Sequence, residues 1–229
     1  MEKVKKVLDR IFIEGLSAMA QGLFATLIIG TIIQQIGSFI PGQAGTILFV
    51  IGKVAASLTG AGIGVAVAYK FNESPLVVVS AATAGMTGAF ASKLLAGTVL
   101  VDGAMVYSGP GEPLGAFLAA YVGIYFGHLV SGKTKVDILV TPIISIGTGS
   151  AVGLILGPPI SGFMVWLGSV INWGTEQQPF LMGIIVSVLM GMILTLPISS
   201  AALGIILNLS GLAAGAATIG CCCNMVGFA

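Results

Sequence analysis

Charged side chains are scarce in this sequence, and their scarcity excludes an ordinary water-soluble protein. Asp, Glu, Lys and Arg make up only 7% of the 229 residues, whereas soluble domains usually carry about 25%. The mean hydropathy of +1.09 agrees with this. Because each span needs about 20 apolar residues, the chain has room for about six to eight transmembrane helices and no separate soluble domain. We therefore predict an all-α integral membrane protein with broken or re-entrant elements.

Residues that bind metals or form disulfides are also rare. The chain has one histidine and three cysteines, and the cysteines are consecutive, at Cys221 to Cys223. Adjacent cysteines rarely bridge, because the geometry is strained, and consecutive helical side chains diverge by about 100°, which disfavours a shared soft metal. We interpret them as small buried packing residues and predict no metal site. The sequence also lacks a P-loop, a dinucleotide fingerprint and a nucleophile elbow, so no cofactor and no catalytic residue are predicted.

Positive charge is concentrated at the beginning of the chain, where Met1 to Arg10 is basic and an apolar run follows. A secretory signal peptide has a similar pattern, but this apolar run is long and no clear cleavage site follows it. We predict that residues 1–14 form a cytoplasmic amphipathic N-terminus and that residues 15–229 form a polytopic membrane domain. The chain has no other basic patch, so no nucleic-acid partner is expected.

Polar and Gly/Pro-rich links divide the chain into candidate spans. The fifth stretch is interrupted at Gly157-Pro158-Pro159, where we expect a helix followed by a half-helix or interfacial piece. Because the sequence stops within an apolar stretch, we expect the membrane domain to be truncated at its C-terminus. The expected spans are residues 15–40, 44–69, 75–101, 113–130, 138–171 and 180–207, with a last apolar stretch at 211–229.

Prolines mark three further positions. Ser74-Pro75 and Thr141-Pro142 each fit a capping residue followed by proline at the first helical position. Pro197 lies within the sixth span. There it either begins a half-helix whose free N–H groups face a polar substrate, or kinks a continuous helix.

Lysine and arginine are distributed unevenly between the predicted loops. With the N-terminus in the cytoplasm, the opposite loops carry neither residue and contain Asp102, Glu112 and Glu176 instead. Basic residues in short loops favour the cytoplasmic side. We therefore predict a multi-pass protein of the bacterial cytoplasmic membrane with a cytoplasmic N-terminus. The basic residues of the cytoplasmic segments are Lys3, Lys5, Lys6, Arg10, Lys70, Lys133 and Lys135.

Two lysines, Lys53 and Lys93, lie deep within predicted spans, where a charge is costly unless it is paired or reaches water. Lys53 shares a helical stripe with Ser57, Gly60 and Gly64, and Lys93 shares one with Ala89 and Gly97. Small-residue faces usually turn toward other helices. We expect both ammonium groups to point into the bundle or a cavity and to contact an anionic or hydroxyl-rich substrate. Snorkelling to the outer interface, or pairing with a carboxylate, is the alternative.

Five other polar residues are candidate substrate ligands. Glu112 precedes Pro113 at a helix start, where the dipole favours negative charge, so it is either a cap or a ligand. His128, the only histidine, lies near the cytoplasmic end of the fourth span and is interpreted as an interfacial anchor or a ligand. A predicted polar loop at residues 172–179 offers donors and acceptors suited to sugar hydroxyls, unless it is only a solvated outer loop. Its candidates are Glu176, Gln177 and Gln178.

A family resemblance lies in four segments. They are residues 25–35 (ATLIIGTIIQQ), 58–64 (LTGAGIG), 108–113 (SGPGEP) and 172–179 (NWGTEQQP). They resemble the PfoR-type membrane proteins, which are classed with the membrane-spanning IIC subunits of the bacterial phosphoenolpyruvate-dependent sugar phosphotransferase system, and the resemblance covers essentially the whole chain. Better-known sugar-specific IIC subunits carry a Gly-Ile-Thr-Glu-Pro motif and a nearby histidine. Here Gly109 to Pro113 keeps only the Gly, Glu and Pro.

The resemblance implies a permease subunit that binds and translocates a sugar or related small solute and is not itself phosphorylated. It implies a separate cytoplasmic IIB-type subunit that donates the phosphate, docking on Lys70 and on Lys133 to Lys135. It also implies a sugar-binding role for Glu112. The expected partners are therefore a solute, a IIB-type subunit and the lipid bilayer.

Three functions are compatible with this pattern. The first is a IIC-type solute transporter with a polar cavity, the second a non-transporting membrane regulator or sensor, and the third an ion-coupled secondary transporter. The spacings Gly60-xxx-Gly64 and Gly211-xxx-Gly215 allow close helix contact and hence a homodimer. The cavity residues expected for the first function are Lys53, Lys93, Glu112, Glu176, Gln177 and Gln178.

Overall fold

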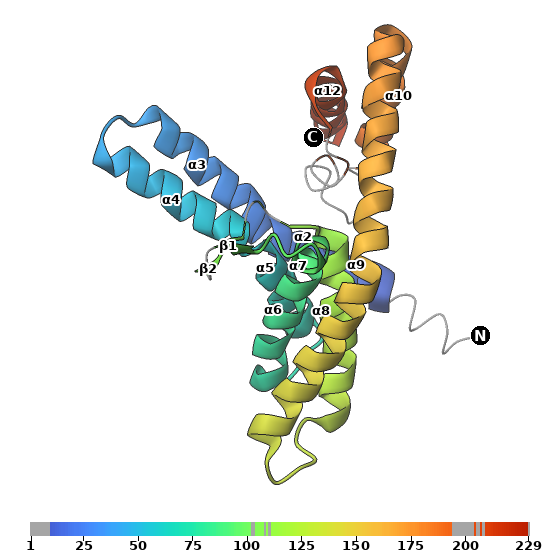
Figure 1. Cartoon of the computed structure of the whole chain (residues 1–229). Helices are drawn as coiled ribbons and strands as arrows, with labels where there is room; N and C mark the ends of the chain where they lie inside the picture. The colour runs from blue at the N-terminus through green and yellow to red at the C-terminus, as the bar shows by residue number, and fades with distance from the viewer. Residues whose placement is uncertain are drawn as a thin grey trace, which may run out of the picture. The chain divides into compact units, whose positions relative to one another are not determined.

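The computed structural model describes residues 10–101, 104–107, 109, 111–193, 204, 207 and 209–228 (Figure 1). Most of these residues are helical, which confirms the predicted all-α membrane protein. The chain forms two compact units, Met1–Ile160 and Ser161–Ala229, which we describe separately. The predicted N-terminal segment 1–14 and the predicted break at Pro197 lie largely or wholly outside the described residues.

Within the part of the chain that the structure describes, three helices are long and apolar enough to cross a membrane. They are Ile13–Phe39, Pro113–Val130 and Asp137–Gln177, and a bent pair, Gln43–Ser57 with Thr59–Lys70, would make a fourth span. Shorter apolar helices cover Pro75–Ala89, Pro179–Met192 and Gly211–Asn224. Broken and short elements therefore account for much of the hydrophobic sequence.

The first unit begins with one long helix that ends where the sequence predicted. Ile40 is extended and Gly42 has a φ of +86°, so the chain turns at Pro41-Gly42. Helix α4 (Gln43–Ser57) then returns along α3, and the two form a hairpin (Figure 1). The segments of the first helix are η1 (Arg10–Gly15), α2 (Leu16–Leu23), η2 (Phe24–Ile28) and α3 (Ile29–Phe39).

The predicted second span, 44–69, is not one helix. Helix α4 ends at Ser57, and α5 (Thr59–Lys70) continues at an angle of 54°. The Thr59 hydroxyl donates to the carbonyl of Ala56 at 2.6 Å, which stabilises the bend. Close packing of α5 on α6 (Pro75–Ala89) explains the change of direction, because Gly60 and Gly64 lie directly against the α6 backbone.

Because of this bend, Lys53 does not share a stripe with Gly60 and Gly64, as the sequence led us to expect. The glycines face α6, and a Cβ at Gly60 would lie 2.8 Å from the Ala89 Cβ and from the Gly85 carbonyl oxygen. The close helix contact that the Gly60-xxx-Gly64 spacing allows is therefore made with α6 of the same chain.

The predicted third span, 75–101, is also divided. Helix α6 starts at Pro75 after Ser74, as predicted, and ends at Ala89. A short helix α7 (Ala91–Leu95) follows, and Gly97 then takes a φ of +69°. Two short strands, β1 (Leu100–Val101) and β2 (Ala104–Met105), pair antiparallel. Lys93 thus lies on α7 and not in the middle of a long span, and its predicted stripe with Gly97 is wrong.

Helix α8 (Pro113–Val130) has the predicted bounds, but α9 (Asp137–Gln177) does not. It begins earlier than Thr141-Pro142 because the Asp137 carboxylate accepts hydrogen bonds from Gly132 N–H at 3.0 Å and from the Thr141 hydroxyl at 2.5 Å. It also continues through Pro158 and Pro159, so the predicted interruption is wrong.

Packing of α9 on the rest of the first unit explains this continuity up to the prolines. Gly149, Gly153 and Gly157 follow one another along a face of α9. A Cβ at Gly149 would lie 2.6 Å from the Ala119 carbonyl oxygen, and one at Gly157 would lie 2.6 Å from the Ala91 Cβ. Tertiary contact on this face therefore favours the helical backbone despite the local preference of proline to end a helix.

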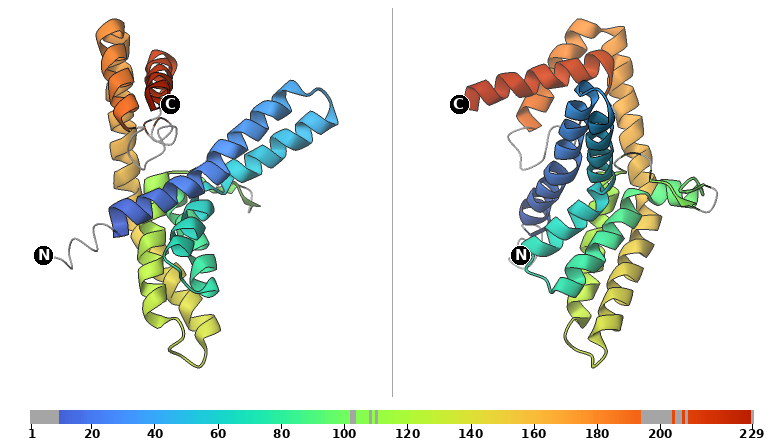
Figure 2. Two further views of the ribbon diagram at one scale, coloured as in Figure 1. Left: turned by 180° about the vertical axis from the view of Figure 1, so that it is seen from behind. Right: turned by 90° about the vertical axis from the view of Figure 1, so that its left-hand side faces the viewer.

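Helices α2, α5, α6 and α8 form the core of the first unit (Figure 2). Their contact surfaces consist largely of small side chains, which permit short distances between helix axes. A Cβ at Gly22 of α2 would lie 2.5 Å from the Gly62 carbonyl oxygen of α5. Fully buried alanines fill the remaining space, at Ala68, Ala81, Ala84, Ala116, Ala119 and Ala120.

The second unit packs α10 (Pro179–Ile193) against α12 (Gly211–Phe228). Val186, Met190 and Ala217 form its buried cluster. The Asn224 amide donates to the Gly191 carbonyl at 2.7 Å, which links the two helices. The predicted loop 172–179 is wrong, because α9 extends to Gln177 and only Gln178 separates it from α10.

The three cysteines lie on α12 of this unit. Cys221 is half-buried and its thiol lies 3.8 Å from the Met190 carbonyl oxygen. Cys222 and Cys223 are exposed. The prediction that all three are buried packing residues therefore holds only in part, for Cys221.

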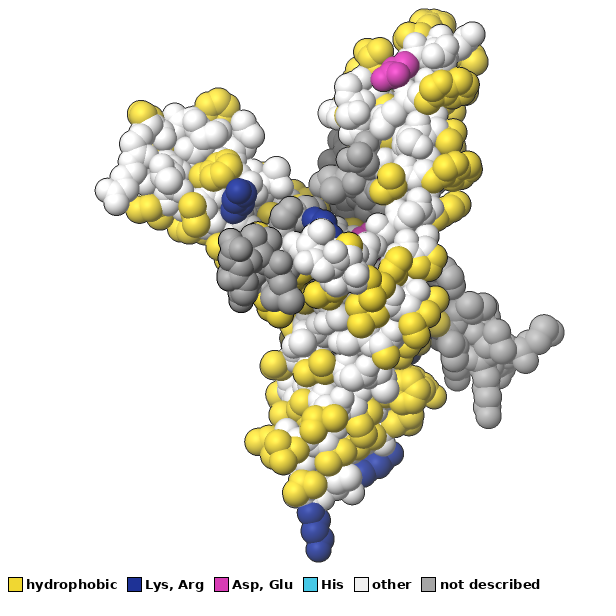
Figure 3. All heavy atoms as spheres, viewed as in Figure 1, with side chains coloured by type: hydrophobic (Ala, Val, Ile, Leu, Met, Phe, Trp, Pro, Cys, Tyr) yellow, Lys and Arg dark blue, Asp and Glu magenta, His cyan; other side chains and the backbone are white. Residues whose placement is uncertain are grey.

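One end of the first unit gathers the loops that the sequence assigned to the cytoplasm. Glu73 lies 3.8 Å from the Arg10 guanidinium and 2.9 Å from His128 Nδ1. The hydroxyls of Ser74 and Ser131 lie 2.8 Å apart, which joins the α5–α6 loop to the α8–α9 loop. Figure 3 shows basic side chains at the end formed by the α8–α9 loop. The two loops and the start of the first helix therefore belong to one side of the unit.

The cytoplasmic orientation of that end is a prediction that fusion proteins test. Alkaline phosphatase matures only in a disulfide-permissive compartment, so we expect activity when it is fused after Gly109 and none when it is fused after Gly132. Immunoblots would check that both fusions are produced equally. Activity at Gly132 together with inactivity at Gly109 would reverse the orientation.

Replacement of Gly64 by Leu tests the α5–α6 contact. The new side chain would meet the Ala81 carbonyl, and such overpacking typically costs about 1–3 kcal/mol. We expect a lower unfolding midpoint for Gly64→Leu in a fixed detergent, measured by the loss of helical circular dichroism. Gly147→Leu is the matched control, because nothing lies within 4 Å of a Cβ at Gly147. Equal midpoints for the two variants would contradict the close approach of α5 to α6.

Candidate functional site

A cavity of about 660 Å³ lies beside the α3–α4 hairpin in the first unit. The chain segment after β2 contributes its third wall. Its size falls in the range of about 300–1,000 Å³ that is usual for small-molecule sites. The lining residues come from three parts of the chain: Leu27, Thr31 and Gln34; Val50, Lys53, Val54, Ala56 and Ser57; and Val106, Tyr107 and Gly109.

Lys53 provides the positive charge of this cavity. Its side chain is exposed, and Nζ lies 5.9 Å from the centroid of the Phe49 ring. No carboxylate among the described residues lies within ion-pair distance of Lys53. The ammonium group therefore has three donors for a ligand, and an anionic or hydroxyl-bearing solute supplies the matching acceptors.

Gln34, Thr31 and Tyr107 add uncharged polar groups to the same cavity. The Gln34 amide donates to the Gly30 carbonyl at 3.4 Å, and the Thr31 hydroxyl donates to the Leu27 carbonyl at 2.7 Å. Both side-chain oxygens still have lone pairs that accept hydrogen bonds. The mixture of one cation, several neutral polar groups and an apolar wall suits a ring with many hydroxyls.

Lys93 lies near this cavity but does not line it. Its Nζ is 5.6 Å from the centroid of the Phe90 ring, and the Phe90 and Tyr107 ring centroids are 4.9 Å apart. Tyr107 itself lines the cavity. Lys93 thus contacts the cavity only indirectly, through the Phe90–Tyr107 pair, and Phe90 lies between the end of α6 and the start of α7.

Glu112 lies beside the same break and caps helix α8. Its carboxylate accepts hydrogen bonds from Leu114 N–H at 3.1 Å and from Gly115 N–H. Its own N–H donates to the Ala89 carbonyl at 2.7 Å, which fixes the start of α8 against the end of α6. Burial raises the pKa of the Glu112 carboxyl. The hydrogen bond from Gly115 N–H, and to a smaller extent that from Leu114 N–H, lowers this pKa and so opposes the rise. The predicted capping role is confirmed.

His128 is separated from these residues by the length of α8. At 1.5 Å per residue, it lies about 24 Å along the helix from Glu112. It is exposed and pairs with Glu73, whose side chain is only 5% exposed. In this conformation His128 does not contribute to the cavity of Lys53. The structure instead places it in the ionic contact at the basic end of the unit.

Glu176, Gln177 and Gln178 belong to the second unit, at the junction of α9 and α10. All three are exposed, and the Gln178 N–H donates to the Gly174 carbonyl at 3.0 Å. A hollow of about 450 Å³ in this unit lies between α10 and α12 and has a largely apolar lining that includes Thr175 but none of these three residues. Their role as ligands stays a prediction.

Several cavity residues were absent from the sequence-based candidates. Gln34 could have been found, because an amide directly after the apolar run of residues 25–33 is unusual in a membrane helix. Tyr107 gave no such signal, since it belongs to a loop segment whose position depends on contacts with α6. Glu73, which lies outside the cavity, also gave no signal in the sequence, because its partners Arg10 and His128 are distant in sequence.

Comparison with known proteins gives one family. The sequence model of the family described as "Phosphotransferase system, EIIC" matches residues 13–229, nearly the whole chain. No curated protein matches the sequence.

The cap at Glu112 leads to a stability prediction. Loss of an N-cap side chain costs about 1 kcal/mol, and Glu112→Ala would leave two backbone donors of a partly buried helix start without acceptors. We expect a lower unfolding midpoint in detergent for this variant at neutral pH. Glu176→Ala, at an exposed position, is the control and should match the unmodified protein. An unchanged midpoint for Glu112→Ala would show that the cap contributes nothing measurable.

Proposed function

This chain belongs to the EIIC family, the membrane sugar-transport subunits of the phosphotransferase system, and we propose that its cavity lined by Lys53, Gln34 and Tyr107 holds the solute during translocation. The observation that supports this most directly is the ammonium group of Lys53 in a cavity without a carboxylate partner among the described residues. Such a charge is expensive in a membrane protein unless it serves a ligand or reaches water.

Two helix breaks border the proposed solute site. The α4–α5 bend of 54° follows Ser57, a lining residue, and the α6–α7 break at Phe90 contacts Tyr107, another lining residue. Breaks of this kind absorb changes in backbone angle during domain and helix movements. We infer that movement of the α3–α4 hairpin about Leu58 opens and closes the cavity.

Lys93 has a supporting role in this proposal. It contacts Phe90, which packs against Tyr107, so Lys93 supports the wall of the cavity without lining it. Glu112 sits at the same break, where it is committed to capping α8. The other predicted ligands stay predictions without a place in this cavity: His128, Glu176, Gln177 and Gln178.

An EIIC subunit works with a cytoplasmic EIIB subunit. We propose that EIIB docks at the basic end of the first unit, where Lys70, Lys133 and Lys135 are exposed beside the α5–α6 and α8–α9 loops. Lysines in exposed loops steer an acidic partner surface by long-range attraction. Within the EIIC family, the segments quoted above support the PfoR-type subgroup.

Uptake measurements test the solute site. Loss of a hydrogen bond to a charged group costs about 1.5–3 kcal/mol, so we expect Lys53→Leu to reduce uptake about tenfold or more. Lys93→Leu should have a smaller effect, because Lys93 does not line the cavity. Lys53→Arg keeps the charge and should retain part of the activity. Uptake would be measured in cells with equal amounts of each variant in the membrane.

Three outcomes would change the conclusion. Normal uptake in Lys53→Leu would remove this cavity as the solute site. If solute binds without any flux in liposomes and a cytoplasmic protein co-purifies, a membrane regulator becomes the better description. Flux that persists without phosphoenolpyruvate and follows a sodium or proton gradient would identify an ion-coupled transporter instead.

A further inference from the structure

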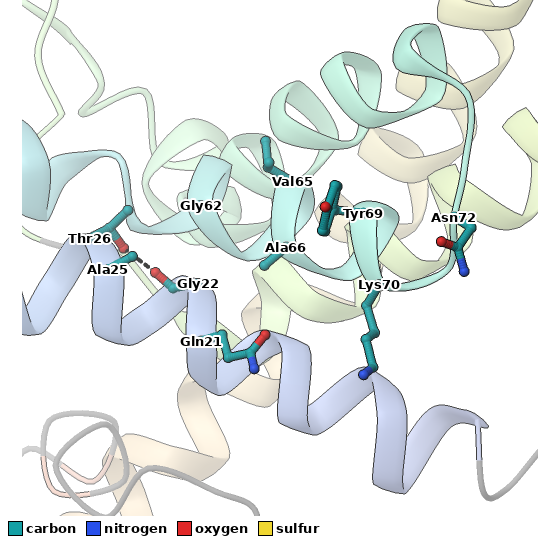
Figure 4. Close-up of a pocket in the computed structure, with 10 residues that line it drawn as sticks. All are labelled: Gln21, Gly22, Ala25, Thr26, Gly62, Val65, Ala66, Tyr69, Lys70 and Asn72. Atoms are coloured by element: carbon teal, nitrogen blue, oxygen red, sulfur yellow. Dashed lines mark hydrogen bonds between the residues drawn. The ribbon is translucent and has the colours of Figure 1, made fainter.

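A second recess, of about 600 Å³, lies on the surface of the first unit along the contact between α2 and α5 (Figure 4). Its floor is the close approach of Gly22 to Gly62, where both helices lack a side chain. It does not share any lining residue with the cavity of Lys53. The recess is therefore distinct from the proposed solute cavity.

The residues along this recess change from polar to apolar in a regular order. On α5, Lys70, Ala66 and Gly62 follow at intervals of four residues, and on the first helix Gln21 and Ala25 do the same. Side chains four residues apart lie one above another on a helix face. Lys70 and Gln21 thus mark the end near the basic loops, and Ala66 and Ala25 lie deeper.

The polar end presents unused hydrogen-bonding groups. Gln21, Lys70 and Asn72 line it (Figure 4), and among the described residues no carboxylate lies within ion-pair distance of Lys70. Tyr69 is 78% exposed beside them, as is typical of an aromatic ring at a membrane–water interface. This end offers an ammonium group and amide donors near the basic loops.

The deeper end offers no free donor. The Thr26 hydroxyl, the one polar side chain among the lining residues there, donates to the Gly22 carbonyl at 2.7 Å. Val65, Ala66 and Ala25 complete an apolar surface. A ligand that fills the whole recess must therefore carry an anionic group at one end and a hydrocarbon chain at the other.

We propose that this recess is a binding site for an anionic phospholipid. The phosphodiester lies against Lys70, with Gln21 and Asn72 as neutral donors, and an acyl chain lies over Ala66 and Ala25 toward Gly62. Charge complementarity selects the headgroup, and the absence of large side chains on both helices leaves room for the chain. The site is independent of the proposed solute cavity.

Lipid binding to the purified full chain tests the site. The probes are phosphatidylglycerol and phosphatidylcholine with identical acyl chains, and retained lipid is counted by native mass spectrometry. One lysine near the membrane surface is expected to favour the anionic lipid about fivefold. Lys70→Gln should remove this preference. Lys133→Gln, at the same end but outside the recess, should keep it, and Ala25→Phe should reduce retention of both lipids by filling the apolar part.

Three results would overturn the proposal. An unchanged preference in Lys70→Gln would exclude the headgroup site. An equal loss in Lys133→Gln would show diffuse attraction to the basic loops instead of a defined site. Displacement of phosphatidylglycerol by glycerol phosphate at equal concentration would show an anion site without a lipid chain. None of these measurements involves solute uptake, so their failure is separate from failure of the proposed transport function.

Discussion

Helices in a lipid environment gain little by burying apolar side chains against one another, because acyl chains are equally apolar. Their association depends instead on close packing, and this chain achieves it through glycine. Gly60 and Gly64 bring α5 onto α6, Gly22 and Gly62 bring α2 onto α5, and the α9 glycines lie against α6 and α8. Van der Waals contact between backbones at these points holds α2, α5, α6, α8 and α9 together in the first unit.

The position of the candidate site follows from this packing. Helix α5 can lie flat on α6 only if it turns away from α4, and that turn leaves the α3–α4 hairpin beside the cavity of Lys53. The end of α6 is held by the hydrogen bond from Glu112 N–H to Ala89, so the segment that carries Tyr107 reaches the same cavity. A charged residue, neutral polar groups and two helix breaks are thereby collected at one place.

Charge has a different function at the other end of the unit. Glu73 joins Arg10 and His128, which ties the first helix to the loops that follow α5 and α8. The lysines near this contact are exposed, and they are the residues to which we assign the proposed EIIB and anionic-lipid contacts. One end of the unit thus combines a structural ion pair with exposed positive charge.

The sequence by itself determined the properties that depend on composition and on local chemistry. The shortage of charge indicated a membrane protein, the Pro41-Gly42 turn and the bounds of α8 were predicted correctly, and capping was one of the two roles expected for Glu112. The helix breaks at Leu58 and Phe90, and the continuity of α9 past Pro158 and Pro159, were not predictable in this way. The breaks, and the helical course of α9 up to the prolines, depend on close contact with α6 and α8, and such contacts between distant segments outweigh local propensity. For the same reason only the tertiary structure separated Lys53 from Gly60 and Gly64, brought Gln34 and Tyr107 to it, and placed His128 at the opposite end of α8.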